Sequence, residues 1–253
     1  MKINREKHIG RVLFIVEGSH TEFVLLRRIF CNLLGYSYLE KRRNRPDFFV
    51  SPQDKYSQVA VINTLESNIR DISENDAYLD EVMDLLRERY HFPVDQSAIY
   101  YLFDRDPKSN LDVPLIQHYI ETLTDPYDNA GNEKAGQLLL SYPSIESYTI
   151  SSFVDHSNLL RFPLGSDSKT YIGQHPDIQM NKLSEDTLLH AAQEFLQFLM
   201  AEGLKDWDMD RFSPTSSAIF TRQETYFSEG PGFKLFSMLT LAFLQMGLLE
   251  LEP

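Results

Sequence analysis

The chain has 253 residues and a formal net charge of −13, and its 42% apolar and 24% charged residues are typical of an ordinary globular protein. This composition excludes disordered and fibrous classes, and the single cysteine, Cys31, excludes a disulfide framework or a zinc knuckle within one chain. The first 50 residues carry ten Lys and Arg against five Asp and Glu, so a basic N-terminal segment precedes an acidic remainder.

Strand and helix patterns alternate along the chain, which predicts a parallel sheet with helices on both faces. Apolar and β-branched runs predict strands at 11–16, 48–50, 97–103 and 137–140. Helical spacing predicts a helix capped by Thr21 and stopped at Gly35, further helices at 77–90 and 114–123, and a short one from Ile145 that Ser144 caps. Residues 58–72 form another amphipathic stretch, and 125–133 a turn-rich loop.

Strand patterns become rare after about residue 155. Two long helices are expected there, a strongly amphipathic one at 183–204 and a second at 232–249. We therefore predict two domains, an α/β domain over 1–155 and a mainly helical C-terminal region over 156–253.

The apolar run 233–249 needs a separate interpretation. It contains Lys234, Gln245 and Gly247 and is short of the roughly 20 apolar residues that span a bilayer. We interpret it as a buried helix or a subunit interface, which predicts a homodimer or docking on a partner subunit. A membrane-anchored toxin is the alternative. The charged N-terminus and the short apolar run 12–16 do not resemble a signal peptide, so we expect a cytoplasmic protein with no membrane partner.

Two predicted strands end in carboxylates. Glu17 follows the strand 11–16, and Asp104 and Asp106 follow the strand 97–103. The C-terminal ends of parallel strands meet at one edge of a sheet, where functional groups gather. Three carboxylates at one point repel one another unless a hard cation neutralises them, and Mg²⁺ accepts oxygen ligands of this kind. For any one of these residues the alternative is a solvated acid at a loop end.

The two strand-end signatures resemble the TOPRIM domain, a Rossmann-like fold of topoisomerases, primases and nucleases of the OLD and RNase M5 type. The resemblance lies in FIVEGSHTE, residues 14–22, and YYLFDRDP, residues 100–107. It implies that Glu17 transfers a proton or binds metal, and that Asp104 and Asp106 hold Mg²⁺, or Mn²⁺ in its place, at a phosphodiester.

A third block, LLLSYPSIESY at 138–148, is similar to a sequence found in stand-alone bacterial TOPRIM proteins of anti-phage defence, such as RloB-like proteins and the AriB effector of the PARIS system. The comparison makes Glu22 and Glu146 candidate accessory metal ligands. Ser147 departs from the asparagine that is common in the related element.

Missing motifs narrow the choice within this family. The segment Gly165–Thr170 is the nearest approach to a phosphate-binding loop, but Ser168 stands where the motif requires glycine. We therefore expect no ATPase within this chain and, by analogy with related systems, an ATPase as a possible partner subunit. The seven histidines show no metal-ligand spacing, and only His20, beside Glu17, merits a test.

Basic residues are the candidate contacts for a nucleic-acid backbone. We predict this role for Arg42, Arg43 and Arg45 in the basic turn, and for Arg105 and Lys108 beside the aspartates. For the turn, a merely solvated segment is the alternative.

The sequence therefore predicts a Mg²⁺-dependent endonuclease that cleaves phosphodiester bonds in RNA, in particular tRNA, or in DNA, as an effector of anti-phage defence. The alternative is a non-catalytic TOPRIM sensor or adaptor that binds a partner ATPase or a phosphorylated ligand.

Overall fold

The structure is a computed structural model, and it describes residues 1–39, 46–127 and 135–252. The chain divides into two compact units. Unit 1 consists of residues 1–4, 103–121 and 139–253, and unit 2 of residues 5–102 and 122–138. Neither unit ends near residue 155, so the division does not coincide with the predicted domain boundary.

The main sheet has seven strands in the order β10-β7-β6-β2-β5-β4-β3. At its centre β2 (Arg11–Val16) pairs in parallel with β5 (Gln58–Asn63) and with β6 (Ala98–Asp104). Antiparallel pairs join β5 to β4 (Asp47–Val50) and β4 to β3 (Ser37–Tyr38). The α/β class and the parallel centre are confirmed, whereas the expectation of a wholly parallel sheet is wrong.

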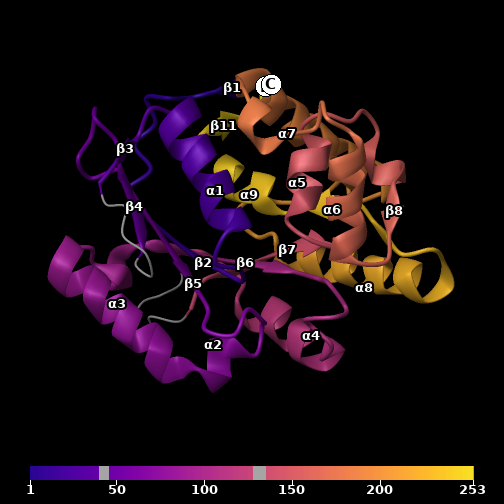
Figure 1. The fold of residues 1–253 in the computed structure, drawn as a ribbon, viewed down its shortest axis with the longest axis horizontal. Helices are drawn as coiled ribbons and strands as arrows, with labels where there is room; N and C mark the ends of the chain where they lie inside the picture. The colour runs from indigo at the N-terminus through magenta and orange to yellow at the C-terminus, as the bar shows by residue number, and fades with distance from the viewer. Residues whose placement is uncertain (40–45, 128–134, 253) are drawn as a thin grey trace. The chain divides into compact units, whose positions relative to one another are not determined.

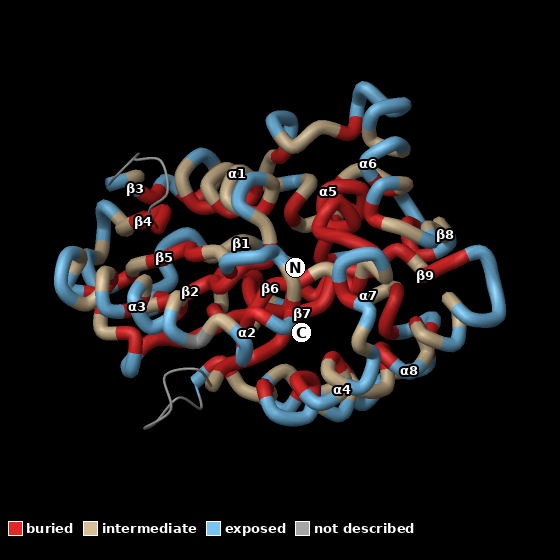
Figure 2. The backbone as a smooth tube through the Cα atoms, turned by 60° about the horizontal axis from the view of Figure 1, so that its bottom comes forward, coloured by how far each residue is buried: buried red, intermediate tan, exposed pale blue. Residues whose placement is uncertain are grey.

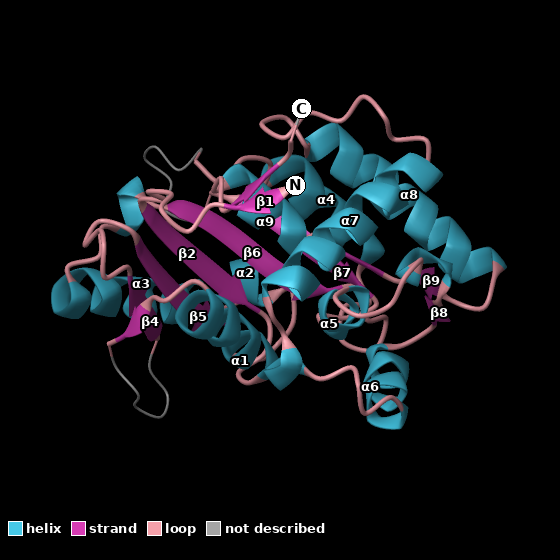
Figure 3. Ribbon diagram, turned by 90° about the horizontal axis from the view of Figure 1, so that it is seen from above, coloured by secondary structure: helices cyan, strands magenta, loops and turns pink. Residues whose placement is uncertain are grey.

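In unit 2, helices cover both faces of the sheet. Figure 1 shows α1 (Thr21–Arg27) on one face and α2 (Asp71–Glu74) with α3 (Asp76–Tyr90) on the other, and Figure 3 shows β5, β2 and β6 side by side between them. All residues of β2 after Arg11 are buried, as a strand covered on both sides requires (Figure 2). The predicted strands and helices at 11–16, 48–50, 77–90 and 97–103 are confirmed.

Two predictions in unit 2 differ from the structure. The amphipathic stretch 58–72 contains the strand β5, whose run Val59–Ile62 is buried because β5 lies between two other strands. The helix after β2 begins at Thr21 itself, and His20 at its N-cap makes no side-chain hydrogen bond, so the predicted capping by Thr21 is wrong. This helix continues as a π-helical segment over Arg28–Leu33 before Gly35, which has a φ of +77°.

Unit 1 is built around the end of β7 (Gln137–Tyr142), which pairs antiparallel with β10 (Phe236–Ser237). In Figure 1, α5 and α7 lie on one side of β7 and α4 and α8 on the other. The helices are α4 (Val113–Thr122), α5 (Glu146–Ser151), α6 (Gly165–Gln174), α7 (Glu185–Ala201), α8 (Ser213–Glu229) and α9 (Leu239–Gln245). Short pairs join β1 (Lys2–Ile3) to β11 (Leu249–Glu250) and β8 (Arg161–Phe162) to β9 (Phe233–Lys234). Single 3-10 turns occupy Ser157–Leu159 and Met180–Lys182 in this unit, and Val94–Gln96 in unit 2.

The predicted helices at 114–123 and 183–204 are confirmed, but the long helix expected over 232–249 is wrong. That segment holds two short strands, β9 and β10, and the seven-residue helix α9. Residue 232 itself has no helical backbone, since the φ of Gly232 is +134° and a Cβ there would lie 2.5 Å from the Phe162 carbonyl carbon.

The apolar side chains of this segment belong to the core. Phe236, Leu239, Phe243 and Leu244 are between 0% and 3% exposed. The segment therefore offers no apolar surface to a second subunit, and the homodimer loses the feature on which its prediction rested. Among the described residues, no helix has the length and apolarity needed to cross a membrane.

Candidate metal and phosphodiester site

The strand ends that carry the predicted acids lie at the same edge of the sheet. In unit 2, Val16 pairs with Leu102 in the parallel register of β2 and β6, and the Glu17 amide donates a hydrogen bond of 3.1 Å to the Leu102 carbonyl. Asp104 follows two residues after Leu102. The ends of β2 and β6 are therefore in register, and the meeting of the three acids at one cation stays a prediction.

Glu17 and Glu22 both lie in unit 2, where they enclose the turn after β2. Both are buried, with exposures of 6% and 5%. The Glu22 side chain accepts a hydrogen bond of 3.2 Å from the Gly18 amide, and a Cβ on Gly18 would lie 2.7 Å from Glu22 Oε2. Thr64 at the end of β5 donates to the Glu17 carbonyl at 3.3 Å. A side chain at residue 18 would therefore displace the Glu22 carboxylate, which packs directly on the turn.

Asp104 and Asp106 lie in unit 1, and backbone amides from two different segments hold them. Asp104 Oδ1 accepts a hydrogen bond of 2.8 Å from the Ile145 amide, in the turn between β7 and α5. Asp106 Oδ2 accepts one of 3.0 Å from the Gly165 amide at the start of α6, and its Oδ1 accepts one of 3.0 Å from the Lys108 amide. Each aspartate therefore accepts at least one hydrogen bond from a backbone amide.

Gly165 lies close to both Asp106 and Ser144. A Cβ at this position would lie 2.7 Å from Asp106 Oδ2, 3.0 Å from the Ser144 Cβ and 3.3 Å from the Ser144 Oγ. Ser144 directly precedes Ile145, the residue that binds Asp104. The two aspartates, the 144–146 turn and the first turn of α6 thus meet at one place in unit 1.

Buried oxygen atoms without hydrogen-bond partners occur in the 144–146 turn and in the first turn of α6. Ser144 Oγ, Glu146 Oε2 and Ser168 Oγ are all buried and unpartnered, in residues that are 1%, 7% and 0% exposed. Lys169, whose side chain is 63% exposed, has its Nζ 3.8 Å from Glu146 Oε1. A buried polar atom without a partner carries a desolvation cost, so these atoms are the ones that a ligand at this site would satisfy.

The donor set fits a hard cation. The side chains beside the 144–146 turn offer carboxylate and hydroxyl oxygens, which are the donors that a hard cation accepts. The nearby phenols of Tyr142 and Tyr148 are fully buried, and burial raises the pKa of each above its ordinary value, so they stay neutral. On the chemistry of the oxygen donors and the unpartnered Glu146 Oε2, the residues fit the Mg²⁺ that the TOPRIM resemblance implies.

Arg105 does not have the role predicted for it. Its guanidinium is 2% exposed and forms a bidentate pair with Glu224 of α8, at 2.7 and 2.8 Å. A third hydrogen bond of 3.0 Å goes to the Asn110 carbonyl. The expectation that Arg105 contacts a polyanion is therefore wrong, because its donors are buried and engaged. Arg105 contacts α8, whereas Asp104 and Asp106 accept hydrogen bonds from the 144–146 turn and from the start of α6.

The structure does not test the other predicted basic contacts. Lys108 is exposed next to Asp106, and its predicted contact with a phosphate stays a prediction. Arg42, Arg43 and Arg45 lie outside the described residues.

The structure thus places Asp104 and Asp106 against the 144–146 turn and the start of α6 in unit 1. A cation shared by Asp104, Asp106 and Glu146, and the approach of Glu17 and Glu22 from unit 2, stay predictions. The sequence interpretation missed the contribution of α6. Its signal was the weak phosphate-loop-like segment Gly165–Thr170, which supplies Gly165, Ser168 and Lys169. The predicted capping of α5 by Ser144 is wrong, because Ile145 is the N-cap residue and the Ser144 hydroxyl makes no hydrogen bond.

Comparisons with known proteins do not add to this description: no family model, no curated protein and no solved structure matches the chain.

Proposed function

We propose that this chain is a Mg²⁺-dependent endonuclease with a TOPRIM-like site, acting on RNA or DNA. The observation that carries the proposal is the convergence of Asp104 and Asp106 on the 144–146 turn, where Ser144 Oγ and Glu146 Oε2 are buried without partners. Such a set of oxygen atoms is costly to bury unless a ligand completes it. The resemblance of residues 14–22 and 100–107 to TOPRIM domains supports the same chemistry.

Asp104, Asp106 and Glu146 would hold the cation in unit 1, with Glu17 as the fourth carboxylate. When bound, Mg²⁺ neutralises the charge that develops on a phosphodiester during cleavage. Glu17 would transfer a proton at the nucleophile or at the leaving group. The amides of Ile145 and Gly165 orient the aspartates, so that little rearrangement is needed when a cation binds.

Two exposed lysines are the substrate contacts that the described residues support. Lys108 follows Asp106 by two residues, and Lys169 lies 3.8 Å from Glu146. Because the chain as a whole carries −13, a nucleic acid is attracted only where such cations face it, and binding should be sensitive to salt.

By resemblance, the proposal includes a role as an anti-phage defence effector with an ATPase as partner subunit. It predicts that expression of the wild-type chain slows cell growth under the triggering condition and that expression of the Glu17→Gln variant does not.

Labelled tRNA, single-stranded DNA and plasmid are incubated with the purified protein in Mg²⁺ or Mn²⁺, with and without EDTA. We expect cleavage of one substrate class that EDTA abolishes. Glu17→Gln and Asp104→Asn should lose cleavage at least about 100-fold while remaining folded. Asp177→Asn is the matched control, since this acid of unit 1 is fully exposed and its ion pair is with Lys182. An absence of cleavage on all substrates, together with binding of a phosphorylated ligand, would instead favour the sensor or adaptor.

A further inference from the structure

A second group of metal-ligand side chains lies in unit 1, between the segment after α5 and the helix α7. Asp155, His190 and Glu194 each offer one ligand atom, and these atoms all lie within 4.8 Å of one another. His190 and Glu194 are four residues apart on the 17-residue helix α7, which places them on one face. Asp155 approaches that face from the loop that follows α5.

The His190 ring is oriented from outside the group. Its Nδ1 lies 2.8 Å from the Ser151 carbonyl, and a carbonyl only accepts, so Nδ1 carries the proton. The other nitrogen, Nε2, faces Asp155 Oδ1 at 2.8 Å. A histidine whose far nitrogen donates to a backbone carbonyl is the usual arrangement of a metal ligand, because that bond fixes the ring and its tautomer.

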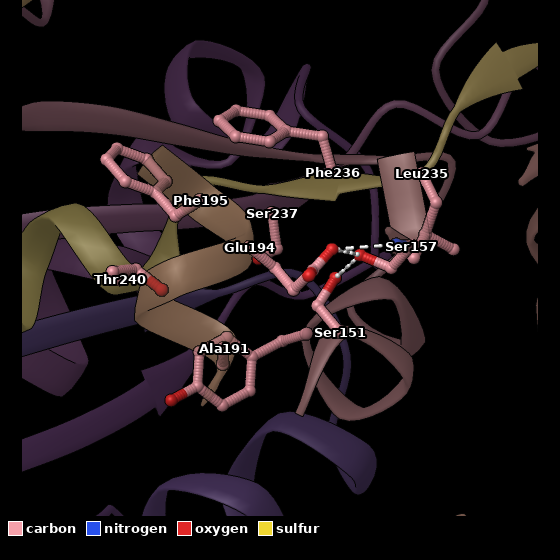
Figure 4. Close-up of a pocket in the computed structure, with 10 residues that line it drawn as sticks. Ser151, Ser157, Ala191, Glu194, Phe195, Leu235, Phe236, Ser237 and Thr240 are labelled. Carbon is pink, nitrogen blue, oxygen red and sulfur yellow. Dashed lines mark hydrogen bonds between the residues drawn. The ribbon is translucent and has the colours of Figure 1, made fainter. Parts of the chain in front are cut away.

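Hydrogen bonds also fix the position of the Glu194 carboxylate. It is 3% exposed, and it accepts hydrogen bonds from the His156 amide at 3.0 Å and from the Ser157 amide and hydroxyl at 2.7 and 2.9 Å. Figure 4 shows its carboxylate directed at Ser157, beside a cavity of about 10 Å³ that Ser151 also lines. Glu194 Oε1 accepts only one of these bonds and so retains a lone pair, whereas Oε2 accepts the other two, since a carboxylate has about four acceptor positions in all.

The buried carboxylate of the group has no cationic side chain of lysine or arginine paired with it. Among the ion pairs of the described residues, none joins Glu194 to a lysine or an arginine. Asp155 is paired with His190, whereas Glu194 is 3% exposed and carries its charge almost completely buried. A divalent cation would compensate that charge.

We propose that Asp155, His190 and Glu194 bind a divalent cation of the zinc type. One imidazole nitrogen and two carboxylate oxygens form a three-ligand set that zinc accepts, with a water in the fourth position, whereas Mg²⁺ prefers an all-oxygen set. The cation takes the place of the proton between His190 Nε2 and Asp155 Oδ1. Asp155 can adjust to it because its side chain is 87% exposed.

The bound cation would tie the 151–157 segment to α7. That segment directly follows α5, the helix that begins with Glu146. The role is thus structural, and the inference does not depend on nuclease activity.

The test is a Zn²⁺ titration of metal-free protein by calorimetry, with thermal unfolding in parallel. His190→Ala should weaken Zn²⁺ binding at least about 100-fold, since even the outer hydrogen-bond partners of a metal ligand contribute about 10–100-fold. His175→Ala is the matched control. Like His190, His175 has its Nδ1 against a backbone carbonyl, that of Tyr171 at 2.7 Å. This variant should bind Zn²⁺ as the wild type does.

Two further variants make the outcome decisive. Asp155→Ala removes an exposed side chain, so it should fold and bind Zn²⁺ more weakly even if His190→Ala does not fold. Asp104→Asn should leave Zn²⁺ binding unchanged, which separates this site from the candidate catalytic site. The inference is overturned if the wild type takes up no stoichiometric Zn²⁺ at about 10⁻⁴ M, a concentration at which weak metal sites in proteins are occupied. It is also overturned if Asp155→Ala binds Zn²⁺ as tightly as the wild type does.

Discussion

Replacing Gly165 with alanine should damage the candidate site without unfolding the protein. The new Cβ would lie 2.7 Å from Asp106 Oδ2, where ordinary contact begins near 3.4 Å, so the carboxylate must move by about 0.7 Å. The move weakens the hydrogen bond from the Gly165 amide, which is worth about 1.5–3 kcal/mol for a charged acceptor. Alanine returns up to about 1 kcal/mol through its helix propensity. We expect a net loss in the free energy of unfolding of about 1 kcal/mol.

The effect on activity should be much larger, because a misplacement of about 1 Å at a reacting centre costs about 100-fold in rate. The assays are urea denaturation and metal-dependent cleavage of labelled nucleic acid. Gly173→Ala is the matched control, since Gly173 lies in the same helix and its Cβ would meet nothing within 4 Å. That variant should be slightly more stable and fully active. If Gly165→Ala cleaves as well as Gly173→Ala, the close approach of Asp106 to α6 has no functional meaning.

Three other predictions test the structure around the site. Arg105→Met leaves the Glu224 carboxylate without its bidentate partner, so urea denaturation should show a loss of about 3 kcal/mol, while the salt dependence of nucleic-acid binding stays unchanged. Burial, with a smaller contribution from nearby Asp47, raises the pKa of the Cys31 thiol from 9.0 to about 11, so alkylation at pH 8 should run about 100-fold slower than for an unperturbed thiol; an equal rate would contradict the burial. Phe243→Ala should cost about 3–5 kcal/mol at every protein concentration, as a core residue does, and a concentration-dependent loss would restore the subunit interface.

The sequence predicted the strands that carry the acids because their signals are local. The run 11–16 is apolar throughout, and a strand buried on both faces has that pattern. The positions of Glu17, Asp104 and Asp106 at the ends of β2 and β6 follow from this alone. The parallel register of the two strands then places those ends level.

The errors arose where distant contacts decide the structure. Residues 59–62 form a central strand because β2 and β4 lie on either side, which no window of the sequence contains. The apolar run 233–249 has helical composition, but pairing of Phe236 with Tyr142 makes part of it a strand. Arg105 has the composition of a phosphate contact, and only the fold reveals Glu224, 119 residues later, as its partner.

The contribution of α6 to the site could not be predicted for the same reason. Gly165 lies 59 residues from Asp106 in the sequence, and the only local signal is an imperfect phosphate-loop pattern. The sequence therefore predicted the acids but not the segment that positions them.

The most direct test of the account is a Mn²⁺ titration followed by the electron paramagnetic resonance of the free ion. It is carried out in the Asp155→Ala background, so that the second site does not contribute. We predict that the protein binds Mn²⁺ tightly in this background and that Mg²⁺ displaces the bound Mn²⁺. Adding Asp104→Asn or Asp106→Asn should weaken Mn²⁺ binding at least about 10-fold, because each substitution removes a charged oxygen ligand. Equal Mn²⁺ binding with and without these two substitutions would contradict the claim that Asp104 and Asp106 form a cation site.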